Sequence, residues 1–167
     1  MRDGFSLLEV VVATAILAML CLAALGALDT STDAYQNGAT HVWLDVRLRN
    51  ALDRVARDLR NTAPSQVAVA APADVSFAVN LGYDGNAIVW GTPTRYFQDT
   101  AAGTLVRQDV VTGAQAVVMT DVPAGGFVVV QPPGSDTIEV TLTAQLTDPD
   151  GEIVSRTLSI SVELRSD

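Results

Sequence analysis

The sequence contains few of the residue types on which most catalytic and metal sites depend. It has one cysteine, Cys21, and one histidine, His41, in 167 residues. A single cysteine excludes an intramolecular disulfide, and a single histidine leaves little scope for a catalytic triad built on histidine. The sequence also shows neither a phosphate-binding loop nor a nucleophile elbow. We therefore predict that the protein is not an enzyme and that it uses no cofactor and no metal ion.

The charge is acidic and unevenly distributed. Lysine is absent, and the formal net charge is −9. Residues 29–62 hold five Asp and five Arg, whereas residues 63–167 hold 12 acidic side chains and four Arg. Nucleic-acid binding usually requires a basic face, so the acidic C-terminal part argues against a nucleic-acid partner.

One acidic stretch near the C-terminus carries carboxylates of the kind that bind calcium. Residues 148–152 read Asp-Pro-Asp-Gly-Glu. The stretch lacks the 12-residue spacing and the closing Glu of an EF-hand loop. Pro and Gly between acidic residues are typical of a turn, so we interpret the stretch as a hairpin turn.

The N-terminal part contains a long apolar run that is directly preceded by one acidic residue. Nineteen uncharged residues extend from Val10 to Leu28, directly after Glu9. About 20 apolar residues in a helix span the hydrocarbon core of a bilayer. A carboxylate in a membrane helix costs about 2.5–3.5 kcal/mol near the bilayer centre, so Glu9 requires a cationic partner. Cleavage between Gly4 and Phe5 would create such a cation, because the new amine of Phe5 would lie one helical turn from Glu9 in the same chain or in a neighbouring one.

These residues resemble the class III signal of type IV pilins and pseudopilins. Gly4 is followed by Phe5-Ser6-Leu7-Leu8-Glu9 and by the uncharged run. The resemblance implies that a prepilin peptidase cuts after Gly4 and methylates the new N-terminal amine of Phe5. It further implies that Phe5 and Glu9 serve assembly with other pilin or pseudopilin subunits, through an assembly platform in the inner membrane.

Three other interpretations of the N-terminus remain open. An ordinary secretory signal has a basic start and a shorter apolar core, although Leu25-Gly26-Ala27 resembles a weak cleavage site. A lipoprotein anchor at Cys21 would need a small residue where Leu20 stands. A plain single-span anchor would leave Glu9 unexplained. Arg2 and the N-terminal amine favour a cytoplasmic N-terminus, and so an inner-membrane protein with its C-terminal part in the periplasm or outside.

Residues 40–61 show a helical pattern with one apolar face. The apolar residues recur every three or four positions, at Leu44, Leu48, Leu52, Val55 and Leu59. We expect this face to pack on a sheet and Pro64 to end the helix. Propensity predicts a break near Gly38, whereas the pilin resemblance implies one helix from about Phe5 to Asn61.

The pair Arg57 and Asp58 has two interpretations. It belongs either to a solvated helix face or to an interface that docks the sheet or a neighbouring subunit, because an arginine–carboxylate contact fixes orientation well.

Beyond Pro64 the apolar residues alternate with polar ones, which predicts half-buried antiparallel strands. Turn residues separate these segments, for example Ala101-Ala102-Gly103 and Pro132-Pro133-Gly134. We expect seven or eight short strands and a core anchored by Trp90, Tyr96 and Phe97. The expected fold class is α+β, with a long N-terminal helix packed on an antiparallel β-sheet head.

The order of these pieces resembles the minor pseudopilin J class of type II secretion and the W-type minor pilins. The resemblance rests on residues 54–60, on Thr94-Arg95-Tyr96-Phe97 with Gly103-Thr104-Leu105-Val106-Arg107, and on a final strand pair. It implies a minor subunit at the tip of a type II secretion pseudopilus. A minor pilin that primes a type IV pilus for adhesion, motility or DNA uptake is the alternative. A membrane-anchored β-domain that binds a ligand and does not polymerise is the alternative of another class.

The expected organisation has four parts. Residues 1–4 are a leader peptide and residues 5–28 a transmembrane and assembly helix. Residues 29–62 form an amphipathic helix, and residues 63–167 form the β head.

Overall fold

The computed structural model describes residues 7–85, 87–148 and 151–165. The chain divides into two compact units, Met1–Ala39 and Thr40–Asp167. Gly4 and Phe5 lie outside the described residues.

One helix, α1, extends from Leu7 to Leu59 without interruption. The continuity implied by the pilin resemblance is confirmed over this range, and the predicted break near Gly38 is wrong. A glycine costs a helix only about 1 kcal/mol relative to alanine, and the helical residues on both sides of Gly38 offset that cost.

The helix ends at Leu59, five residues before Pro64. Two side chains just beyond this end cap the helix by donating hydrogen bonds to carbonyls of its last turn. The Thr62 hydroxyl donates to the Asp58 carbonyl at 3.4 Å, and the Asn61 amide donates to the Arg57 carbonyl at 3.4 Å. A short 3₁₀ turn at Pro64–Gln66 then leads into the first strand.

Ten strands follow within the described residues. They are β1 (Val67–Ala71), β2 (Asp74–Phe77), β3 (Asn80–Asp84), β4 (Ala87–Trp90), β5 (Thr94–Asp99), β6 (Thr104–Asp109), β7 (Gln115–Met119), β8 (Phe127–Val130), β9 (Thr137–Thr147) and β10 (Ile153–Glu163). The expected seven or eight strands were too few. Strands β3, β7 and β8 lack a clear alternation of apolar and polar residues, and therefore give little sequence signal.

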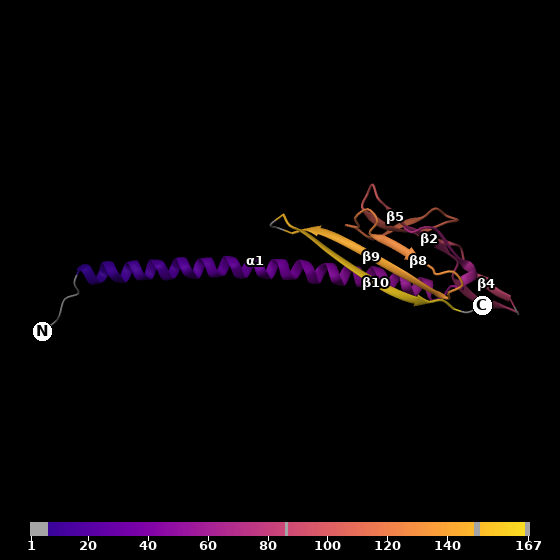
Figure 1. Cartoon of the computed structure of the whole chain (residues 1–167), viewed down its shortest axis with the longest axis horizontal. Coiled ribbons are helices and arrows are strands. Elements are labelled where there is room, and N and C mark those ends of the chain that lie inside the picture. The colour runs from indigo at the N-terminus through magenta and orange to yellow at the C-terminus, as the bar shows by residue number, and fades with distance from the viewer. Residues whose placement is uncertain (1–6, 86, 149–150, 166–167) are drawn as a thin grey trace. The chain divides into compact units, whose positions relative to one another are not determined.

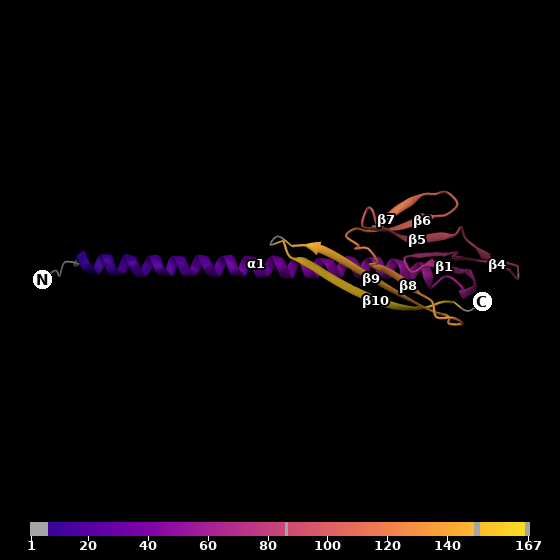
Figure 2. The same ribbon diagram turned by 45° about the horizontal axis from the view of Figure 1, so that its top comes forward.

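The strands form three antiparallel sheets. The first has the order β1-β2-β5-β6-β7, the second β10-β9-β8, and β3 and β4 pair as a separate hairpin. Figure 1 shows β8, β9 and β10 beside the C-terminal part of α1, and Figure 2 shows β5, β6 and β7 as a neighbouring layer. The α+β class, with a long N-terminal helix packed on antiparallel sheets, is confirmed.

The C-terminal part of α1 and the two larger sheets share one core. The five apolar residues that predicted the buried helix face are at most 4% exposed, which confirms that face. They pack with Phe77 of β2, Phe127 of β8 and the inward side chains of β9. Of the three expected aromatic anchors only Tyr96 is fully buried, whereas Trp90 and Phe97 are half-buried and lie outside the core cluster. Trp90 belongs to the separate hairpin, and Phe97 points to the opposite face of β5 from Tyr96.

The acidic stretch at residues 148–152 joins β9 to β10. The Gly151 amide donates to the Asp148 carbonyl at 3.0 Å, and the Asp148 amide donates to the Glu152 carbonyl at 2.9 Å. These bonds are those of a tight hairpin turn, as predicted. Asp150 of this stretch lies outside the described residues.

Candidate assembly interface

The first unit presents apolar side chains along the helix. Its large aliphatic residues between Leu7 and Leu28 are all at least half exposed. Glu9 lies in the first turn of α1 and is exposed, in a segment otherwise free of charge. Within the described residues, α1 is the helix whose length and apolar composition suffice to cross a membrane. This surface can bury itself against lipid or against similar helices.

Cys21 is exposed on the same segment of α1, and the described part of the chain contains no other cysteine. An exposed thiol within an apolar helix surface behaves as a small apolar residue.

In the second unit, Asp58 connects the helix to the five-stranded sheet. Its Oδ2 accepts a hydrogen bond from the Tyr96 hydroxyl at 2.8 Å and another from Arg107 Nε at 3.1 Å. Tyr96 is on β5 and Arg107 is on the adjacent strand β6, where the two residues stand directly opposite each other. One carboxylate therefore holds two neighbouring strands against α1.

The surroundings of these groups shift two pKa values. Burial raises the pKa of the Tyr96 hydroxyl, and its hydrogen bond to the negative Asp58 raises it further. For Arg107 burial lowers the pKa, but the hydrogen bond and the charge of Asp58 outweigh burial, so that its pKa is raised. Tyr96 thus stays neutral and Arg107 stays charged throughout the neutral range, which keeps the contact intact.

Arg57 does not share this contact, because its side chain is exposed on α1. The structure thereby separates the predicted pair: Asp58 faces the sheet and Arg57 faces outward. Among the described residues, two further ion pairs join α1 to the β head, Arg47 with Asp121 at 3.3 Å and Asp45 with Arg156 of β10 at 3.9 Å. Arg47 also stacks on the Trp43 ring, at 4.3 Å from its centroid.

The partners of Asp58 were not predicted from the sequence. Asp58 stands directly before the buried Leu59 and three positions after Val55, so it lies at the border of the apolar face. That position was a signal that the carboxylate reaches the sheet. Nothing in the local sequence pointed to Tyr96 and Arg107 as its partners, because they follow 38 and 49 residues later.

The described residues offer no group of three or more His, Cys, Asp or Glu side chains that would hold a metal ion. His41 is half-buried on α1, and its Nδ1 is shielded from solvent and has no hydrogen-bond partner among these residues.

Comparison with known protein families gives a match at the N-terminus. Residues 1–25 match the family model described as the prokaryotic N-terminal methylation motif. The matched range contains Gly4, Phe5 and Glu9, and the match is consistent with a type IV pilin-like protein. Comparisons with curated proteins and with solved structures give no significant match.

Proposed function

We propose that this chain is a minor subunit of a type IV pilin-like filament and that its role is structural, not catalytic. The observation that carries the proposal is the N-terminal methylation motif at residues 1–25. The motif implies processing by a prepilin peptidase and assembly with other pilin subunits. The continuous helix α1 packed on antiparallel sheets supports the same function, since it is an α+β pilin-like layout.

In the proposed sequence of events the peptidase cleaves between Gly4 and Phe5 and methylates the Phe5 amine. Residues 1–4 are then the leader, and residues 5–28 hold the precursor in the inner membrane. Residues 29–62 continue the helix beneath the head, and residues 63–167 form the head in the periplasm. An assembly platform in the inner membrane extracts the helix into the filament.

Glu9 has a specific part in this mechanism. Lipid tails are as apolar as the helix surface, so burial from water gives helices in a membrane no preference for one another over lipid. A pair between the Glu9 carboxylate and the Phe5 ammonium of a neighbouring subunit would supply that preference and set the register. The exposure of Glu9 within the apolar helix surface leaves its carboxylate accessible for such a pair.

We place the subunit at the tip of a type II secretion pseudopilus. The single cysteine favours a pseudopilin or a minor pilin over a major pilin, since the head cannot carry the C-terminal disulfide found in many major pilins. The acidic composition of the head argues against the DNA-uptake form of the type IV pilus alternative. Neighbouring genes distinguish the two systems, because a secretin with a secretion ATPase would favour the pseudopilus and a retraction ATPase the pilus.

The N-terminal mass of the protein purified from membranes tests the proposal. The expected product begins with N-methylated Phe5, and Gly4→Leu should accumulate as the uncleaved precursor. Gly26→Leu is the matched control, because it makes the same change in the apolar segment and should leave processing unaffected. An intact Met1 in cells with active prepilin peptidase would overturn the proposal, and a start at Leu28 would instead identify an ordinary secretory signal.

A further inference from the structure

The longest strand pair of the head ends in an open edge. Strand β10 is the outer strand of the sheet β10-β9-β8, and its eleven residues pair with β9 in a register without a bulge. Long regular edge strands are templates for pairing with another chain, and proteins commonly blunt them with Pro, Lys or a bulge. Strand β10 contains neither Pro nor Lys, and from Thr157 to Val162 it carries no charge.

The hydrogen-bond pattern shows which backbone groups are open. Leu164 continues the β9 register and donates to the Asp136 carbonyl at 2.7 Å. Since bonded residues alternate along an antiparallel strand, even-numbered residues of β10 bond to β9 and odd-numbered ones face outward. The next odd residue, Arg165, accordingly donates outward, to the Thr62 carbonyl at 3.0 Å. In the described part of the chain, no backbone partner faces the outward groups of Ser155, Thr157, Ser159 and Ser161.

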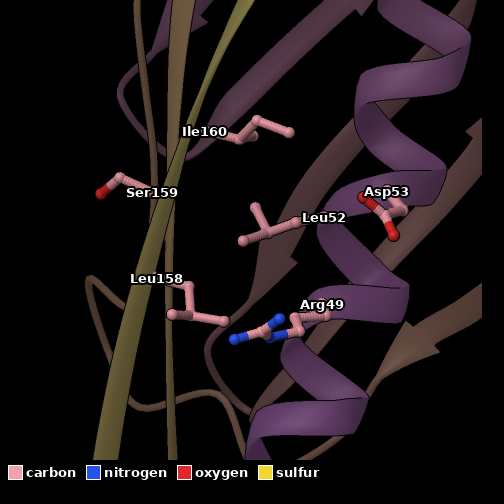
Figure 3. Close-up of a pocket in the computed structure, with 6 residues that line it drawn as sticks. All are labelled: Arg49, Leu52, Asp53, Leu158, Ser159 and Ile160. Carbon is pink, nitrogen blue, oxygen red and sulfur yellow. The ribbon is translucent and has the colours of Figure 1, made fainter.

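A cavity lies beside this open edge. It has a volume of about 290 Å³ and is lined by Arg49, Leu52 and Asp53 of α1 and by Leu158, Ser159 and Ile160 of β10. Figure 3 shows the Leu52 side chain pointing to the strand between Leu158 and Ile160, while Ser159 points away from the helix. None of the lining residues comes from β9, so the cavity lies between α1 and the edge strand β10. Leu158 and Ile160 are only half-buried there.

Two side chains of opposite charge line the cavity, Arg49 and Asp53. Arg49 reaches toward Leu158 in Figure 3, and within the described residues its guanidinium makes no ion pair or hydrogen bond. On the opposite face of the sheet the neighbours are hydroxyls, which bond across the strands from Ser159 to Thr141 and from Thr157 to Thr143, both at 2.8 Å. An incoming strand therefore meets, on one face, a cavity in which Arg49 lies beside the apolar Leu52, Leu158 and Ile160, and on the other face a hydroxyl surface.

We propose that the edge of β10 binds an extended segment of a partner protein as an additional β-strand. The side chains of this segment alternate between the two faces of the sheet. Polar side chains extend the hydroxyl face, and on the other face one apolar side chain fills the cavity over Leu52. An acidic residue two positions from that apolar one lies on the same face and pairs with Arg49. Backbone bonds to the odd-numbered residues of β10 supply affinity, and the cavity supplies specificity, as in other cases of strand addition. The proposal concerns the head alone and does not depend on processing or on filament assembly.

Binding of a synthetic peptide to the full-length protein in detergent micelles tests this site. The probe is fluorescently labelled Thr-Glu-Thr-Leu-Thr-Val-Thr with blocked ends, measured by fluorescence anisotropy. Ser161→Pro removes an outward amide without touching a bond to β9, and should weaken binding about tenfold. Ser161→Ala is the matched control, because it keeps the amide and should bind within about twofold of the wild type.

A charge exchange tests the same site without altering the strand. Arg49→Glu should weaken binding of the Glu-containing peptide and strengthen binding of a peptide with Arg in place of Glu. Arg57→Glu, on the same helix but away from the cavity, should change the binding of neither peptide. Amide exchange of Thr157, Ser159 and Ser161 should be fast in the free protein and should slow on binding, with that of Leu158 and Ile160 already slow. Absence of peptide binding to the wild type, equal affinity of Ser161→Pro and Ser161→Ala, or protection that does not alternate would overturn the proposal.

Discussion

The Asp58 carboxylate on α1 and the Tyr96 hydroxyl on β5 are 2.8 Å apart, although 38 residues separate them in the chain. Tyr96 is fully buried and stacks on Phe77 of the adjacent strand β2, with 6.0 Å between the ring centroids. A hydroxyl buried in an apolar core requires a hydrogen-bond partner. Asp58 provides it at the border of the core, and Arg107 balances the charge of Asp58 at 3.1 Å.

Removal of Asp58 should therefore destabilise the head more than removal of the hydroxyl that binds it. Asp58→Ala leaves the Tyr96 hydroxyl and the Arg107 guanidinium unpaired, and should lower the free energy of unfolding by about 2–3 kcal/mol. Tyr96→Phe removes only the donor and should cost about 1 kcal/mol. Denaturant unfolding of the full-length protein in detergent measures both values.

Asp53→Ala is the control for Asp58→Ala, because Asp53 is an exposed carboxylate on the same helix without an ion pair among the described residues. Its effect should stay within about 0.5 kcal/mol. Equal effects of Asp53→Ala and Asp58→Ala would show that the contact with Tyr96 and Arg107 contributes nothing to stability.

Stability should fall above about pH 10 because of Tyr96. Burial and the hydrogen bond to Asp58 raise its pKa from the ordinary value of 10.0. The unfolded chain then releases the Tyr96 proton near pH 10 while the folded chain still holds it, so that rising pH favours unfolding. Below pH 10 the contribution of Tyr96 is fully present. The measurement is the free energy of unfolding between pH 8 and 11 for the wild type and Tyr96→Phe.

The difference between the two proteins in this titration should be constant below about pH 10 and should shrink above it. A constant difference throughout the range would mean that Tyr96 has the same pKa in the folded and unfolded states.

An introduced charge should destabilise the head on one face of α1 and have little effect on the other. Leu48 is 0% exposed and Val46, two residues earlier, is 51% exposed. Leu48→Asp places an unpaired carboxylate in the core and should cost about 4 kcal/mol or more, or prevent folding of the head. Val46→Asp should change the free energy of unfolding by less than about 1 kcal/mol. Thermal unfolding followed by circular dichroism compares the two, and similar losses would contradict the one-sided packing of α1.

Glu9→Ala should impair assembly and leave folding unchanged. The substitution removes the cost of a carboxylate in the membrane, so insertion should be at least as efficient and the head should melt as before. In the proposed filament the ammonium of a neighbour's Phe5 would then be left unpaired among apolar helices, which costs more than the pair itself contributes. Crosslinking to neighbouring subunits in membranes should therefore decrease, together with secretion or piliation.

Asp29→Ala is the matched control for Glu9→Ala, because it removes the same charge at the other end of the uncharged run. Undiminished crosslinking and normal function of Glu9→Ala would refute a role for Glu9 in assembly. A defect intermediate between the control and complete loss would favour a subunit at the tip, which makes fewer such contacts than a repeating one.

The sequence by itself determined the N-terminal motif, the apolar run and the buried face of α1. All three are local patterns. The spacing of Leu44, Leu48 and Leu52 matches the 3.6-residue period of a helix, so the buried face follows from the spacing without knowledge of the sheet that covers it. The alternation in β9 and β10 similarly identified the inward side chains, because side chains alternate along any strand.

The tertiary structure decided which of these faces meet. A period of two assigns Ile160 to one face of β10, but it does not say that β10 is the outer strand or that Leu52 lies across a cavity from it. Strands without clear alternation, such as β8, also escaped prediction. Burial does alternate along β8, but its outward residues Val128 and Val130 are apolar as well, so the sequence shows no period of two. The contact of Asp58 with Tyr96 and Arg107 could not be predicted from the sequence either. Strand order and the placement of a helix on a sheet depend on pairings between distant segments, and the local sequence period carries no information about those pairings.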